Sequence, residues 1–151
     1  MPQVFKDADG DEWELSLTFG TVEQIEATLG VNLGCPEVPT LGGIPLLARL
    51  SVDIVLQSRL IWACCKTSPL VRQHAIKEEH FYDDILVDQT FRDAYAAWLA
   101  EYRLFFRRRS FGDPMRLKRL ETVIDEALTR LNSGSGSGSG AESAASPTRA
   151  A

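Results

Sequence analysis

The sequence has no long apolar run and no recognisable leader. No uninterrupted apolar stretch approaches the roughly 20 residues that a membrane-spanning helix needs, so no membrane span is predicted. The first ten residues, MPQVFKDADG, lack a basic start followed by an apolar core, so no secretory signal is predicted either. We therefore expect synthesis and residence in the cytoplasm.

Cysteine is scarce, with only Cys35, Cys64 and Cys65 in 151 residues. Three cysteines do not make a disulfide framework. Cys64 and Cys65 are neighbours in the apolar run LIWACC, where free cysteine usually serves as a small buried hydrophobe. This usage fits a reducing compartment.

Histidine is also scarce, and neither residue has the spacing of a metal ligand. His74 and His80 are six apart, whereas two ligands on one helical face would be three or four apart. Glu78 and Glu79 lie nearby, but no third strong ligand stands at zinc spacing. Exposed polar residues are the favoured interpretation, and no metal is predicted.

Motifs for catalysis are missing as well. G-x-S-x-G is absent, no histidine is paired in the sequence with Cys35, and the LGG at 41–43 falls short of a phosphate-binding loop. The sequence therefore predicts a protein that is not an enzyme, with no catalytic residues and no cofactor.

What the sequence does have is an ordinary globular composition with unevenly placed charge. It is 44% hydrophobic and 25% charged, and its length suits one domain with a moderate core. The net charge is −5, yet residues 101–120 carry seven Lys or Arg against two acids. Residues 1–30 show the opposite balance, with seven acids against Lys6. Such asymmetry would orient an approaching partner without naming it.

Alternation in FKDADGDEWELSLT predicts two strands, at 3–7 and 12–18, in a hairpin over 3–18. Asp9-Gly10 is a strong two-residue turn signal, because both positions tolerate positive φ. The acids in this stretch also resemble calcium ligands, but an EF-hand loop needs glycine at its sixth position. Counted from Asp7, Gly10 is fourth, so a solvated turn is favoured.

Apolar periodicity and capping signals predict the helices. Thr21 with Gln24 resembles a capping box, Gly30 a C-cap, Asp53 an N-cap, and Asp113-Pro114 a cap and first turn. The predicted helices span about 21–30, 46–50, 53–66, 70–86, 89–107 and 113–131, where 70–86 stands for one or two short helices. The 53–66 helix is apolar on most sides and is predicted to be buried and central.

Together these elements predict an α+β fold, mostly α. A two-stranded N-terminal β-hairpin packs on a bundle of four to five helices, within a single globular domain at 1–131. From Asn132 the chain turns to SGSGSGSG and then AESAASPTRAA, which lack large apolar residues. We expect a flexible, disordered C-terminal tail at 132–151.

Two features of residues 89–111 suggest binding. Aromatic residues recur at spacings of 4, 3, 4 and 3 from Phe91 to Phe105, a seam that is more often core than interface. Leu104 and Phe106 lie off this seam, which predicts some exposed apolar surface. The run RRRSF at 107–111 is either a solvated helix end or a patch for acidic helices or phosphates. The acidic net charge weighs against nucleic acid.

The order of elements resembles the tail assembly chaperones of long-tailed bacteriophages and prophages. The resemblance is carried by FKDADGDEWELSLT, IEATLGVNL, LLARLSVDIVLQSRLIWACC and FYDDILVDQTFRDAYAAWLAEYRLFF, and covers about residues 4–131. It implies a non-catalytic chaperone of the tape measure protein that acts in the host cytoplasm and is absent from the mature virion. Tail tube subunits and self-association are further candidate contacts.

Two other functions stay open at this point: a structural tail or head–tail completion protein, and a small nucleic-acid-binding regulator. For the chaperone, a helical partner with an apolar face and charged rims fits the residue pattern. The predicted partner-binding residues are Leu99, Phe106, Arg107, Arg108, Arg109 and Phe111.

Overall fold

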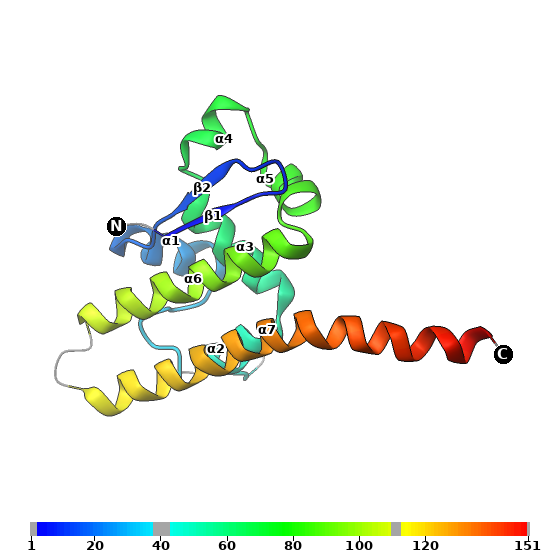
Figure 1. The fold of residues 1–151 in the computed structure, drawn as a ribbon. Helices are drawn as coiled ribbons and strands as arrows, with labels where there is room; N and C mark the ends of the chain where they lie inside the picture. The colour runs from blue at the N-terminus through cyan, green and yellow to red at the C-terminus, as the bar shows by residue number, and fades with distance from the viewer. Residues whose placement is uncertain (1–2, 38–42, 110–112, 151) are drawn as a thin grey trace.

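The computed structural model describes residues 3–37, 43–109 and 113–150, with side chains described as far as Asn132. It confirms an α+β fold that is mostly α (Figure 1). The elements, in order, are β1 Gln3–Lys6, β2 Glu12–Leu15, α1 Phe19–Leu29, α2 Leu46–Val52, α3 Ile54–Cys65, α4 Pro69–Gln73, α5 Glu78–His80, a π-helical turn Phe81–Ile85, α6 Asp88–Arg109 and α7 Pro114–Ala150. None of these described helices combines the length and apolarity needed to cross a membrane.

The hairpin is confirmed, and its acids serve the turn. Asp7 Oδ1 accepts the backbone N–H groups of Asp9 and Asp11, each at 3.0 Å, and Asp7 Oδ2 accepts Trp13 Nε1–H at 3.1 Å. Asp7 N–H also donates to the carbonyl of Asp11, so the loop has three residues rather than the predicted two. Gly10 supplies the positive φ, at +86°. This geometry is a three-residue hairpin loop with glycine in the left-handed position.

Helix α1 begins earlier than the sequence predicts. Thr18, not Thr21, is the N-cap, and its Oγ1 accepts the Thr21 N–H at 3.2 Å. The C-cap prediction is confirmed, because Gly30 adopts φ +72°. The shift places Phe19 in the first turn of the helix, where its side chain is exposed.

Asp53 caps α3 as predicted, accepting the Leu56 N–H at 3.0 Å. The prediction that this helix is buried is confirmed for one face and wrong for its first turn. Its buried positions lie in one stripe, namely Leu56, Gln57, Leu60, Ile61, Cys64 and Cys65. Ile54 and Val55 in the first turn are exposed, whereas the buried stripe packs among α6, β2, α1 and α2.

The segment predicted as one or two helices at 70–86 is three short pieces. After α4 the chain passes through Ala75 with φ +50°, which ends the first piece. The α5 turn then continues directly into the π-helical turn. Phe81 begins that turn and is fully buried, its ring 5.1 Å from Trp13 and 5.0 Å from Trp62.

Helix α6 is the centre of the domain. It contacts β1 on one side, α3 on another and α7 on a third (Figure 1). The aromatic seam is confirmed as core: Tyr95, Trp98 and Tyr102 are buried, with successive ring centroids 6.1 and 5.1 Å apart. Contact between neighbouring rings at these distances adds to the free energy gained by burial.

Two tyrosines of α6 hold distant backbone segments. Tyr95 donates its hydroxyl hydrogen to the carbonyl of Leu50, which also accepts Gln57 Nε2–H at 2.8 Å. Tyr102 donates to the carbonyl of Leu33 at 2.6 Å. Burial raises the pKa of both phenols, so both stay protonated as donors at neutral pH. These bonds fix the end of α2 and the segment after α1 to the central helix.

Helix α7 returns antiparallel to α6. Asp113 caps it as predicted, accepting the Arg116 N–H at 3.0 Å. Leu131 packs against the core, and the predicted domain boundary at 131 stays a prediction. The backbone stays helical to Ala150 and projects past the body (Figure 1), where the sequence predicts a flexible tail. A nucleated helix extends at one hydrogen bond per added residue, although each glycine costs about 1 kcal/mol relative to alanine.

Candidate functional site

The structure divides the predicted partner-binding residues into surface and core. Arg107, Arg108 and Arg109 are exposed at the end of α6. Leu99 is 0% exposed and Phe106 is 3% exposed, so the expectation that they lie on a contact surface is wrong. Both are covered because α6 is surrounded by other elements, including the returning α7. Phe111 lies outside the described residues.

The three arginines differ in what they contact. Arg107 pairs with Glu121 of α7. Arg109 turns back on its own helix, its guanidinium 4.0 Å from the centroid of Phe105 and 3.3 Å from the Phe105 carbonyl oxygen. Arg108 forms no ion pair with any residue in the described part of the chain. Arg108 is therefore the cation of this cluster that is best placed to meet a partner.

Phe19 is a surface residue that the sequence interpretation missed. It is 61% exposed and stands between two hollows of about 300 and 330 Å³. Phe105 and Arg109 also line both hollows, and Arg108 lines the first. The sequence interpretation missed it because it placed the N-cap at Thr21, whereas Thr18 is the N-cap and Phe19 falls in the first turn of α1. We call Phe19, Leu104, Phe105, Arg108 and Arg109 the basic–aromatic surface.

A buried carboxylate fixes one wall of this surface. Glu101 is only 9% exposed, and its Oε2 accepts the buried Leu17 N–H at 3.0 Å. The bond joins α6 to the segment that leads into α1. Phe19, two residues later, is thereby held beside the end of α6. Surfaces positioned by buried hydrogen bonds bind without a large ordering cost.

Arg116 of α7 fixes the residues on the opposite side of the basic–aromatic surface, at the second hollow. Its Nε and Nη2 donate to the two carboxylate oxygens of Glu37 at 2.9 and 2.8 Å, and Nη2 also donates to the Gly34 carbonyl at 2.6 Å. Its guanidinium carbon lies 5.3 Å from the centroid of Phe106. A bidentate pair of this kind fixes orientation as well as distance. The segment around Gly34 is thereby attached to the first turns of α7.

This ion pair predicts a pH dependence. The hydrogen bonds from Arg116 hold the pKa of Glu37 below its ordinary value of 4.5. A carboxyl whose pKa is lower in the folded state stabilises the fold above its unfolded pKa, and that stabilisation is lost as the pH falls through the folded pKa. Replacing Glu37 by Gln should therefore lower the free energy of unfolding at pH 6, by at most about 1 kcal/mol for a partly exposed pair. The difference from wild type should shrink toward pH 3.

Urea titrations followed by circular dichroism at both pH values would measure this difference. Glu79→Gln is the matched control, since Glu79 is exposed and forms no ion pair within the described residues. A Glu37→Gln effect that is the same at pH 3 and pH 6 would contradict the assignment.

The two neighbouring cysteines are buried in the core, and the two histidines lie at the surface. Burial raises the pKa of Cys64 to about 12 and the pKa of Cys65 well above its ordinary value. Both thiols are therefore protonated at neutral pH, as predicted for small buried hydrophobes. His74 and His80 are exposed, and His80 Nδ1 lies 2.8 Å from Asp84 Oδ2. In the described ranges, no three His, Cys, Asp or Glu side chains are grouped so that they could hold a metal ion.

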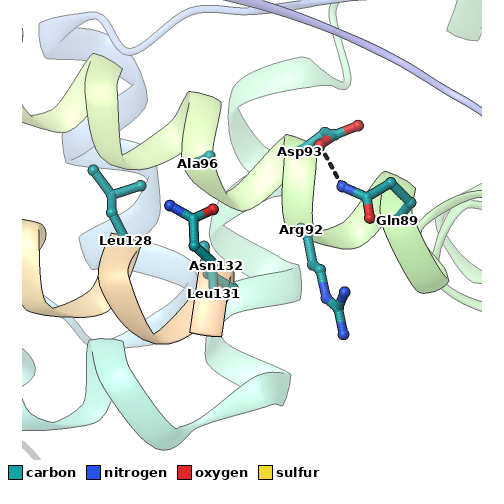
Figure 2. A pocket seen from close by; sticks show the side chains of 7 residues that line it. All are labelled: Gln89, Arg92, Asp93, Ala96, Leu128, Leu131 and Asn132. Carbon is teal, nitrogen blue, oxygen red and sulfur yellow. Dashed lines mark hydrogen bonds between the residues drawn. The ribbon is translucent and has the colours of Figure 1, made fainter. Parts of the chain in front are cut away.

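A further hollow of about 320 Å³ lies between the start of α6 and the later turns of α7 (Figure 2). Gln89 Nε2–H donates to Asp93 Oδ1 at 2.9 Å on the same helix. In Figure 2 the Arg92 side chain extends away from this pair. Leu128 and Leu131 supply apolar walls. Its polar groups do not converge on one point, so the hollow does not have the arrangement of a small-molecule site.

Comparison with protein-family models, with curated proteins and with solved structures finds no match for this chain. The assignment of the basic–aromatic surface as a candidate site therefore rests on the geometry of this chain alone. Its distinguishing features are an exposed aromatic ring, an arginine without an ion pair in the described residues, and two adjoining hollows.

Proposed function

We propose that this protein is a non-catalytic tail assembly chaperone of a long-tailed phage or prophage. It binds the tape measure protein in the host cytoplasm during tail assembly and is absent from the mature virion. The observation that carries the proposal is the basic–aromatic surface, which presents Phe19 and Arg108 at one end of α6. The order of sequence elements described above supplies the identity of the partner.

The chemistry of this surface suits a helical partner. Aromatic and arginine side chains supply much of the binding energy in protein interfaces, particularly beside pockets that exclude water. Phe19 can bury its ring against an apolar stripe, while Arg108 pairs with an acid at the edge of that stripe. Many copies along one long client can act together, so each contact need not be tight.

A pull-down after co-expression with the tape measure protein tests the proposal. Replacing all three arginines by glutamate would not test the surface alone, because Arg107 and Arg109 also make contacts within the domain. Phe19→Ser/Arg108→Glu changes two exposed side chains instead. We expect recovery of the tape measure protein to fall at least about tenfold, as the loss of one hot-spot residue can produce.

Val4→Ser/Arg72→Glu is the matched control, since Val4 and Arg72 are exposed and line neither hollow. Equal recovery with both double variants would refute the assignment of the surface. Mass spectrometry of purified particles is an independent test of the role. A chaperone should be missing from them, whereas a stoichiometric amount would identify a structural tail component.

A further inference from the structure

A second surface lies between α2 and α7 and shares no residue with the basic–aromatic surface. It is an open groove of about 530 Å³. Its lining is Leu47, Met115, Lys118, Arg119, Thr122 and Val123. We call it the α2–α7 groove. Met115 is 70% exposed and supplies apolar surface to this groove.

The groove arises because two helices have more apolar surface than the core covers. On α2, Leu46 and Leu50 are fully buried, whereas Leu47 is only partly buried. On α7, Leu120 and Ile124 face the core, and Val123 lies at the border of that face. Met115, Arg119, Thr122 and Val123 follow one another at helical spacings of 4, 3 and 1, so they form one stripe along α7.

The charges at this groove are of one sign. Lys118 and Arg119 are both exposed, and neither forms an ion pair with any described residue. Three arginines of α6 and α7, by contrast, do form ion pairs: Arg103 with Asp125, Arg107 with Glu121, and Arg116 with Glu37. An apolar floor with two cations at its rim is complementary to a partner that combines apolar and acidic groups.

We infer that the α2–α7 groove is a docking site for an acidic amphipathic helix. Such a helix would place apolar side chains at i, i+3, i+4 and i+7 over Leu47, Met115 and Val123, with carboxylates meeting Lys118 and Arg119. The inference does not rest on the proposed function, because it concerns a different face and needs no particular client.

A second copy of this chain fits the groove less well. Two-fold pairing of the groove on itself would bring Lys118 and Arg119 against their own counterparts, because such an interface places the same patch on both sides. Helix α1 is acidic, with exposed Glu23 and Glu26, but its apolar Val22 and Ile25 are already buried in the domain. It has no free apolar stripe to offer.

Fluorescence anisotropy with the full-length protein tests the inference. The probe is a labelled peptide of about 14 residues, near 20 Å as a helix, with leucine at the four spacings above and glutamate on its flanks. We expect a Kd on the order of 10 to 100 μM. Lys118→Glu/Arg119→Glu should weaken binding at least about tenfold, and Met115→Ser should weaken it too, since both sets of side chains are exposed and tolerate substitution.

The matched control is Arg72→Glu/Lys77→Glu, which makes the same change in net charge at exposed positions outside the groove. It should leave the affinity unchanged. Amide chemical-shift mapping should place the peptide at residues 47 and 115–123. Phe19→Ser/Arg108→Glu should not affect it, which separates a failure of this inference from a failure of the proposed function.

Four results would overturn the inference. The first is no binding at millimolar protein, and the second is equal binding of a peptide with lysine in place of glutamate. The third is a set of shifts confined to the basic–aromatic surface. The fourth is a concentration-dependent dimer, detected by sedimentation without peptide, whose formation Met115→Ser abolishes; this would identify a second copy as the occupant.

Discussion

Replacing Trp13 by Ala should lower the free energy of unfolding by about 3–5 kcal/mol, the usual range for a large aromatic residue in a core. Trp13 is fully buried in β2 and stacks on Phe5 with ring centroids 6.1 Å apart. Its ring also meets Phe81 edge-on, and its indole N–H is bonded to Asp7. One substitution therefore removes contacts to the other strand, to the π-helical turn and to the hairpin loop.

Urea unfolding of the full chain, followed by far-ultraviolet circular dichroism, would measure this loss. Val4→Ala in the paired strand is the control, and it should change the free energy of unfolding by less than about 0.5 kcal/mol because Val4 is half exposed. Trp13→Phe should be intermediate, since it keeps ring packing but loses the bond to Asp7. A loss below about 1 kcal/mol for Trp13→Ala would show that the hairpin contributes little to the fold.

Replacing Glu101 by Leu should cost about 2–3 kcal/mol, the second largest effect that we expect. The substitution leaves the buried Leu17 N–H without its acceptor, and a buried donor that loses a charged partner is costly. Leucine is also a different shape from the side chain it replaces. The loss should therefore affect the segment into α1 first, and with it the position of Phe19.

Glu101→Gln separates the acceptor from the charge. Its side-chain oxygen can still accept the Leu17 N–H, so the loss should be smaller than for Glu101→Leu. Hydrogen exchange at Leu17 gives a local measurement alongside urea unfolding, with faster exchange expected for the leucine variant only. Equal protection of Leu17 in the wild type and in Glu101→Leu would contradict this account.

The sequence was sufficient for features that depend on local chemistry. Gly30 at the end of α1, Asp53 before α3 and Asp113 before α7 were predicted from capping rules, and all three serve those roles. The aromatic seam of α6 was predicted from its helical period and is core. In each case the deciding interactions lie within about one turn of the residue concerned.

The capping rules predicted the wrong start for α1, because two threonines could serve as its N-cap. Thr18 and Thr21 are both acceptable N-caps, and Gln24 favoured the second. The structure uses Thr18, whose Oγ1 accepts the Thr21 N–H and whose carbonyl accepts the Val22 N–H, and Phe19 therefore lies in the first turn with its ring exposed. Because of this error, the sequence interpretation did not identify Phe19, the main exposed aromatic residue of the candidate site.

Burial of individual residues depended on contacts that are distant in sequence. Phe106 and Leu99 were predicted to be accessible, yet α6 is covered on several sides by elements that include α7. The ion pairs Arg103–Asp125 and Arg107–Glu121 show the antiparallel register that brings α7 over α6. No periodicity within α6 contains that information. The same limit applies to Ile54 and Val55, whose exposure in the first turn of α3 is not indicated by their apolar side chains.

The packing of β1 against α6 has a consequence for synthesis on the ribosome (Figure 1). The strand Gln3–Lys6 is translated first, but the helix it rests on begins at Asp88 and ends at Arg109. At 5–20 residues per second, roughly 100 further residues require about 5 to 20 s. During this interval Phe5 and Trp13 can already stack on each other, but the face of β1 that rests on α6 in the folded protein stays uncovered.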